Sequence, residues 1–189
     1  MLGDGSIYAH KNQSQVSICG NLKEKEYMIG YVKPLFEGVF KIRFNIKFRE
    51  YANGLYVYKN SKSLVFTLNK YGLVSGNKKS KGAKIPPWIF SNKSYLRACL
   101  RGIIDTDGCV YPRNNTNLYP NIWVSSAIPS LRISITKAFN KLGFSLSSWK
   151  EGRNYASIRR RSEVERYYKE IGFSNPKHLI RFQKFMIEK

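Results

Sequence analysis

The sequence repeats one order of patterns twice, and this repeat constrains the fold more than any other feature. Each copy starts at an Asp-Gly step, Asp4-Gly5 and Asp107-Gly108, and continues through a polar strand region, a helix, a strand pair and a final helix. Near the end of each copy, YVYKNSKSLVFTLNKYG at 56–72 aligns with ASIRRRSEVERYYKEIG at 156–172, an offset of about 100 positions. Two patterns of similar length and order predict a duplication, so we expect two related halves.

The two halves are expected at residues 1–75 and 89–189, with a linker at 76–88. The linker reads GNKKSKGAKIPPW and is rich in Gly, Lys and Pro, as a connection that crosses between two halves should be. At 189 residues and 42% hydrophobic residues, the chain can bury a core of the size that two small halves need. We therefore predict a compact fold.

Periodicity predicts both strands and helices in each half. Strand patterns run from 6 to 18, from 39 to 50 and from 55 to 58. Helical patterns run from 22 to 36, 61 to 71, 92 to 107, 129 to 142, 162 to 171 and 176 to 187.

The segment VFKIRFNIKFRE at 39–50 carries the clearest strand pattern. Its apolar residues alternate strictly with polar ones, which predicts a half-buried strand with a basic outer face. Cations side by side on one face repel one another unless something anionic lies against them, and a phosphate backbone would relieve that cost. An ordinary solvated sheet face is the alternative. The outward residues are Lys41, Arg43, Asn45, Lys47 and Arg49.

The charge balance points to a polyanion as the partner. There are 33 Lys and Arg against 12 Asp and Glu, a formal net charge of +21 spread along the whole chain. Nucleic acid fits dispersed cations best, and a merely solvated basic surface is the alternative. No apolar run approaches the roughly 18 residues of a membrane-spanning helix. Three scattered cysteines form no CxxC pair, so the sequence supports neither a zinc site nor a disulfide framework.

The helix that ends near Asp107 carries the candidate chemistry. Within YLRACLRGIIDTDG at 95–108, Ala98, Gly102 and Thr106 form a stripe of small residues that would let a second helix approach closely. Gly3 precedes Asp4 just as Thr106 precedes Asp107, so two such helices would bring two carboxylates together, as a divalent cation on a phosphodiester requires. The alternative is that each Asp simply precedes Gly in a helix-to-strand turn.

At these residues the chain resembles a known family. LRGIIDTDG at 100–108 resembles the LAGLIDADG motif of homing endonucleases along its whole length, and MLGDG at 1–5 resembles the tail of a first copy. IPPWI at 85–89 and IGFSNPKH at 171–178 are also typical of two-motif members. The resemblance implies an α+β fold of two pseudo-symmetric αββαββα halves. It places the paired motif helices at the centre and shapes the two antiparallel sheets into a saddle over DNA.

The same resemblance assigns a site. Asp4 and Asp107 would hold Mg²⁺ or Mn²⁺, with help from the backbone carbonyls of Gly3 and Thr106. Lys62 would be the basic residue at the rim of the first half, and a solvated lysine is its alternative. Because Ser162 stands at the matching position, Arg159 or Arg161 would serve the second half. The residues expected to contact DNA are Gln13, Gln15, Lys41, Arg43, Asn45, Lys47, Arg49, Arg159 and Arg161.

Only three residues precede Asp4, so we expect the first motif helix to be truncated. The resemblance implies a monomeric homing endonuclease that cuts double-stranded DNA at a specific sequence and serves the mobility of an intron, an intein or its own gene. The alternative is a cleavage-inactive relative that binds DNA as a regulator or intron RNA as a splicing maturase. An unrelated basic protein of chromatin or the ribosome would explain the charge but not the repeat. We expect the protein in the cytoplasm, associated with the nucleoid, or in an organelle, without a membrane partner.

Overall fold

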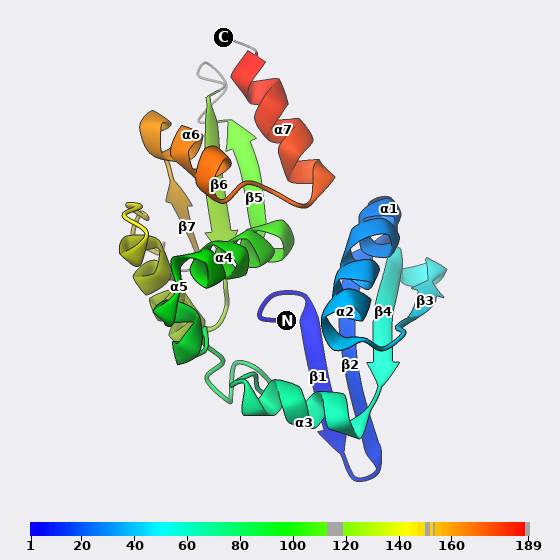
Figure 1. The fold of residues 1–189 in the computed structure, drawn as a ribbon. Helices are drawn as coiled ribbons and strands as arrows, with labels where there is room; N and C mark the ends of the chain where they lie inside the picture. Colours follow the sequence, from blue (N-terminus) through cyan, green and yellow to red (C-terminus); the bar gives the residue numbers. More distant parts are fainter. Residues whose placement is uncertain (113–118, 150–151, 153, 188–189) are drawn as a thin grey trace. The chain divides into compact units, whose positions relative to one another are not determined.

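The computed structural model describes residues 1–112, 119–149, 152 and 154–187 (Figure 1). The chain divides into two compact units, Met1–Lys81 and Gly82–Lys189, and the division falls inside the expected linker at 76–88. Each unit has its own antiparallel sheet with helices packed on it. The fold is therefore α+β with two antiparallel sheets, as the sequence predicts.

The first unit contains a four-stranded antiparallel sheet in the order β1-β2-β4-β3. A helical run joins β2 to β3, and α3 follows β4. The strands are β1 (Gly5–His10), β2 (Gln13–Asn21), β3 (Asn45–Arg49) and β4 (Gly54–Asn60). The helical elements are η1 (Leu22–Glu24), α1 (Lys25–Tyr27), the π-helical turn η2 (Met28–Val32), α2 (Lys33–Phe40) and α3 (Lys62–Lys70).

Alternation along these strands places the apolar residues on one face of the sheet. Ile7 lies opposite Val16, and Ile18 lies opposite Val57, so all four side chains point into the same core. Val16 and Val57 have no exposed surface. Helix α3 covers this face and begins where the Ser61 hydroxyl accepts a hydrogen bond from the Leu64 N–H at 3.1 Å.

The strand region expected at 6–18 is a β-hairpin. β1 and β2 pair in antiparallel register out to His10 and Gln13, and a two-residue loop at Lys11 and Asn12 joins them. Lys11 takes φ 48°, the left-handed conformation that a tight hairpin turn needs. The two polar loop residues form this turn without the glycine that is usual in such turns.

The prediction of one continuous strand at 39–50 is wrong. Helix α2 extends to Phe40, Lys41 ends it at φ 55° with its N–H bonded to the Glu37 carbonyl, and the strand begins only at Asn45. The Glu37 carboxylate explains the turn, because it accepts hydrogen bonds from the Lys33 ammonium at 2.7 Å and from the Phe44 N–H at 2.8 Å. These two bonds lower the pKa of Glu37. The apolar residues before Asn45 therefore serve a helix end and a turn.

The second unit contains a three-stranded antiparallel sheet in the order β5-β6-β7. The four helices expected here are confirmed to within one residue at each end. A fourth strand, expected from the αββαββα pattern, is not assigned among the described residues. The elements are η4 (Pro87–Ser91), α4 (Lys93–Asp107), β5 (Gly108–Pro112), β6 (Pro120–Ser125), α5 (Pro129–Lys141), β7 (Tyr155–Ile158), α6 (Arg161–Glu170) and α7 (Pro176–Ile187).

Helix α4 is the centre of the second unit. It begins where the Asn92 side chain accepts a hydrogen bond from the Ser94 N–H at 2.7 Å, and its Leu96 and Leu100 have no exposed surface. Phe139 of α5 and Tyr167 of α6 are also fully buried, with ring centroids 6.4 Å apart. No helix in the described part of the chain is long and apolar enough to cross a membrane.

Candidate nucleic-acid interface and metal site

The sheet of the first unit has one polar face, on the side away from the core. In register across the strands, Gln15 lies opposite Tyr8 and Asn60, and Cys19 lies opposite Tyr56, which lies opposite Lys47. Because the core residues occupy the alternate positions, all of these side chains share the outer face. Of the residues expected to contact DNA, this outer face carries Gln13, Gln15, Asn45, Lys47 and Arg49.

Two contacts hold side chains in place on this outer face. The Gln15 amide nitrogen donates a hydrogen bond to the Asn60 amide oxygen at 2.8 Å. The Arg49 guanidinium lies over the Tyr56 ring, 4.7 Å from its centroid. Side chains fixed before binding lose less conformational entropy when they meet a ligand. The outer face therefore presents amides and cations in defined positions, as readout of base edges and phosphates requires.

Lys41 and Arg43 lie outside this outer face. Both are exposed, but Lys41 ends helix α2 and Arg43 lies in the turn that follows it, so neither belongs to a strand. Their expected place on a strand is wrong because α2 runs further than its sequence pattern indicates. Their contact with DNA stays a prediction.

The outer side of the second sheet is aromatic. The Trp123 ring stacks on Tyr155 with centroids 4.6 Å apart and lies 5.7 Å from Tyr111. Arg181 of helix α7 reaches this side, where its guanidinium donates to the Cys109 sulfur at 3.1 Å and lies 5.5 Å from the Tyr111 centroid. Arg181 was not among the predicted residues, since nothing in a helical pattern shows which strand it will contact.

The two arginines expected at the rim of the second half differ in their contacts. Arg161 begins α6, pairs with Glu165 at 3.1 Å and lies over the Tyr119 ring at 5.1 Å. Arg159 is exposed and donates to the Ser157 hydroxyl at 2.8 Å. Since the charge of Arg161 is already balanced, Arg159 is the better rim candidate. Lys62 is exposed at the first position of α3, as a rim residue or a solvated lysine would be.

Asp107 is the last residue of α4 and is half-buried. The chain turns into β5 at Gly108, where a Cβ atom would lie 2.4 Å from the Ile104 carbonyl oxygen, so only glycine fits. The Thr106 hydroxyl bonds back to the Gly102 carbonyl at 3.1 Å. A helix C-terminus carries partial negative charge, and its last carbonyls point beyond the helix. One carboxylate and one carbonyl at this end fit a hard divalent cation that also binds water and phosphate.

Asp105, the other carboxylate of the same motif, has a structural position. It is only 4% exposed and accepts hydrogen bonds from the backbone N–H groups of Ser174 and Asn175, each at 3.1 Å. The Asn175 side chain donates to the Asp105 carbonyl at 3.1 Å. These bonds tie the start of α7 to α4, and burial raises the pKa of Asp105 in spite of them. Asp105 was not among the predicted site residues.

The first unit places Asp4 differently. Asp4 is exposed just before β1, and residues 1–4 are not helical. Its carbonyl accepts a hydrogen bond from the Cys19 N–H at 3.1 Å. The Lys78 ammonium donates to the carbonyls of Leu2, at 3.1 Å, and of Gly3. Because an ammonium is bound at the carbonyl expected to hold a metal, a divalent cation does not fit at Gly3 in this conformation.

Asp4 and Asp107 belong to different units. The expected convergence of the two carboxylates stays a prediction. Within the described ranges, no three His, Cys, Asp or Glu side chains gather as a metal site would need. A metal here would therefore take its remaining ligands from backbone carbonyls, water and phosphate.

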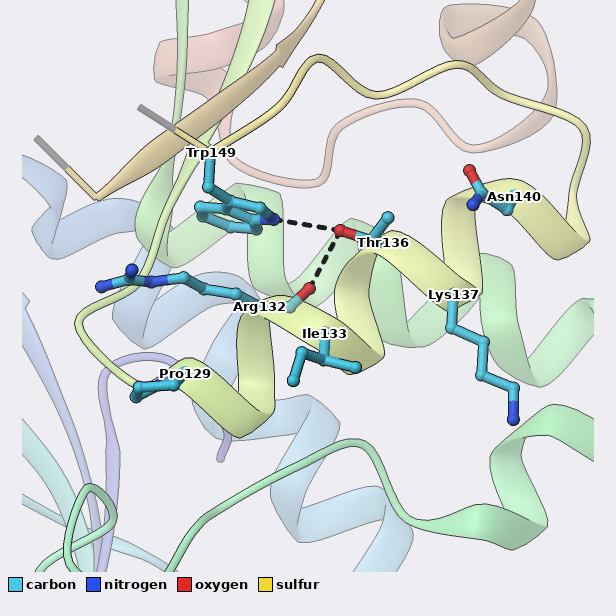
Figure 2. Close-up of a pocket in the computed structure, with 7 residues that line it drawn as sticks. All are labelled: Pro129, Arg132, Ile133, Thr136, Lys137, Asn140 and Trp149. Carbon is cyan, nitrogen blue, oxygen red and sulfur yellow. Dashed lines mark hydrogen bonds between the residues drawn. The ribbon is translucent and has the colours of Figure 1, made fainter. Parts of the chain in front are cut away.

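A separate groove runs along helix α5 (Figure 2). It encloses about 560 Å³, and the Trp149 indole N–H in its wall donates to the Thr136 hydroxyl at 3.0 Å. The lining is mainly apolar and basic and includes no carboxylate that could bind a divalent cation. None of the expected site residues is among those that line it: Pro129, Arg132, Ile133, Thr136, Lys137, Asn140 and Trp149.

The two features that stand out are the α4 helix, which ends in an Asp-Gly step, and, in the other unit, the polar and basic outer face of the sheet. Residues 94–172 match the LAGLIDADG-like domain family. Residues 94–172 therefore carry a LAGLIDADG-like domain, and the resemblance seen in the sequence is confirmed.

Solved homing endonucleases share the fold of most of the chain. A structure of mesophilic variants of I-DmoI is 15% identical and has a TM-score of 0.63, with 90% of this chain and 89% of that chain covered. I-DmoI in complex with DNA and Mn is 16% identical, with 90% of each chain covered and a TM-score of 0.63. I-LtrWI bound to target DNA is 14% identical, with 98% and 85% covered and a TM-score of 0.61.

One curated relative is much longer than the part that matches. The replication factor C small subunit of Methanocaldococcus jannaschii is 41% identical over 54 residues. These residues make up 28% of this chain and 3% of that protein. The chain therefore spans only a small fraction of this relative.

Cys19 offers a test of whether the outer face of the first sheet contacts DNA. Cys19 is exposed on the outer face, opposite Tyr56 and in the same cross-strand row as Lys47, whereas burial raises the pKa of the Cys99 thiol to about 11. Only the thiolate reacts, so a maleimide at neutral pH should modify Cys19 well before Cys99. We expect specific DNA to slow modification of Cys19 by about tenfold or more, measured by mass spectrometry of peptides. An unchanged Cys19 rate in a saturated complex would exclude this face as the interface.

Proposed function

We propose that the protein is a site-specific endonuclease that hydrolyses phosphodiester bonds of double-stranded DNA with Mg²⁺ or Mn²⁺. The observation that carries the proposal is the end of α4, where Thr106 and Asp107 offer a carbonyl and a carboxylate within a LAGLIDADG-like domain. The solved relatives support it, since I-DmoI was crystallised with DNA and Mn, and its G20S variant with target DNA and Mg.

The outer face of the first sheet would grip the duplex. Lys47 and Arg49 suit phosphate oxygens, and the Gln15 and Asn45 amides suit base edges in the major groove. A net charge of +21 would steer the chain to DNA and hold it there through counterion release. The chain would therefore attract DNA through its charge and hold it on the outer face of the first sheet.

The chemistry would take place at the acidic residues. A divalent cation, once bound, polarises the phosphate and lowers the pKa of a water molecule. Asp107 and the Thr106 carbonyl would hold it in the second unit, and Asp4 and the Gly3 carbonyl would be the matching ligands in the first once Lys78 has left Gly3. Arg159 and Lys62 would stabilise charge that develops on the phosphate.

Replacing Lys47 with Met should weaken DNA binding and lower its salt dependence. Each phosphate contact contributes about 0.9 to the slope of log K against log salt, so we expect that slope to fall by about one. Lys70→Met, at the exposed end of α3, removes the same charge away from the outer face and is the control. Mobility shifts at several salt concentrations measure both variants. Equal slopes for wild type and Lys47→Met would show that Lys47 does not contact phosphate.

The function is tested by incubating the chain with a supercoiled plasmid library that carries randomised and genomic insertion-site DNA. The proposal predicts linear products in Mg²⁺ and none in EDTA, with sequenced ends that converge on one target. Retention of one duplex or one RNA without cutting would instead favour a cleavage-inactive relative. The Lys78 ammonium on the Gly3 carbonyl is the observation that favours this second candidate.

A further inference from the structure

We propose that Lys78 is a tethered cation of the first unit that competes with the divalent metal for the Gly3 carbonyl. The inference rests on the proposed function, because it concerns the metal position that the function assigns to Gly3 and Asp4. Lys78 lies in the linker, 76 positions from Leu2 in the sequence, and its half-buried side chain donates to the carbonyls of both Leu2 and Gly3.

The backbone around Lys78 is built to hold it there. The Gly76 N–H bonds to the Ile7 carbonyl of β1 at 2.7 Å, which ties the segment to the first strand of the sheet. The Asn77 side chain accepts hydrogen bonds from the N–H groups of Lys79 at 2.9 Å and Ser80 at 3.1 Å, forming an Asx turn. Lys78 therefore projects from a fixed turn beside β1 and reaches residues 2 and 3.

The ammonium and a divalent cation exclude each other at this position. Both cations bind carbonyl oxygens. Two cations bound to the same oxygen would be only a few ångströms apart and would repel each other. The neighbouring carbonyl of Asp4 is engaged by the Cys19 N–H, so the segment offers the carbonyls of Leu2 and Gly3 to a cation. A metal could use Gly3 only after Lys78 has left it.

The second unit is different at the matching position. In the described part of the chain, no lysine ammonium is bound to the Thr106 carbonyl, and the Thr106 hydroxyl is turned back onto α4. The two metal positions should therefore differ in affinity, the first being the weaker. The DNA strand served by Asp4 would be cut more slowly than the strand served by Asp107.

The test is a titration of the full chain with Mn²⁺ in the absence of DNA, in which electron paramagnetic resonance measures the bound metal. Lys78→Met should lower the Kd of one Mn²⁺ site by about ten- to hundredfold. Mn²⁺ then no longer has to displace a charge-assisted hydrogen bond from the Gly3 carbonyl. The gain should vanish when Asp4→Asn is added. Lys79→Met removes the same charge from the exposed next residue and should bind Mn²⁺ as wild type does.

Lys78→Gln protects the test against a variant that fails to fold, because it keeps a donor for the two carbonyls without the charge. It should also tighten the Asp4-dependent site. The inference is overturned if neither variant binds Mn²⁺ more tightly, or if wild type already binds Mn²⁺ through Asp4 with the affinity of Lys78→Met. Since no step needs cleavage, a chain that never cuts DNA refutes the proposed function and leaves this result standing.

Discussion

Replacing Asp107 with Asn should lower the rate of DNA cleavage by at least about 1,000-fold and leave DNA binding within a few fold of wild type. Asn has nearly the same shape but no charge, so the last turn of α4 keeps its geometry and loses its anionic metal ligand. A bound metal stabilises the transition state by several kcal/mol, and each 1.36 kcal/mol changes the rate by about tenfold. Single-turnover cleavage and mobility shifts on the same duplex measure the two quantities.

The control for Asp107→Asn is Glu26→Gln, which removes an equal charge from an exposed position in α1. It should cut at the wild-type rate. Cleavage by Asp107→Asn at that same rate would exclude Asp107 as a metal ligand. A parallel loss of binding and cleavage would assign Asp107 to folding or DNA contact instead.

Asp105→Ala should destabilise the fold by about 3 kcal/mol, the largest effect on stability that we expect from a single carboxylate. The change leaves the buried N–H groups of Ser174 and Asn175 without an acceptor, and each unsatisfied group costs about 1–3 kcal/mol. Asp105→Asn keeps one acceptor oxygen and should cost less. Urea unfolding monitored by circular dichroism measures both, and equal stability of wild type and Asp105→Ala would contradict the capping role.

The stability difference between wild type and Asp105→Asn should also depend on pH. Burial raises the pKa of Asp105 in the folded state above its ordinary value of about 3.9. Between these two values the folded chain binds more protons than the unfolded chain, so the contribution of Asp105 falls as pH rises through this window. Below the window it is fully present. Urea unfolding of both chains from about pH 4 upward tests this, and a constant difference would contradict it.

Much of the fold is readable from the sequence where the determinants are local. Asn92 and Ser61 cap helices a few residues downstream, and apolar periodicity marks the helices between them. The stretch before Asn45 misled because its conformation depends on a side-chain contact with Glu37, the residue seven positions before Phe44. The Glu37 carboxylate captures the Phe44 N–H and bends the chain there, which a period of two does not reveal.

The residues of the candidate site also differ in whether the sequence could predict their roles. The outward face of the first sheet follows from alternation, and Asp107 follows from the motif. The ion pair of Arg161 with Glu165 spans four helical positions and was open to prediction from the sequence. Lys78 and the partners of Asp105 were not, because their hydrogen bonds join residues about 70 positions apart, which only the fold brings together.

We expect this chain to cut both strands of one DNA sequence with a divalent metal. The most direct measurement is strand-resolved cleavage of the duplex recovered from the plasmid library, with each strand labelled at its 5′ end and the wild-type chain in excess. We predict one cut in each strand in Mg²⁺ and none in EDTA. Tight, selective binding of that duplex with both strands intact in Mg²⁺ would contradict the claim.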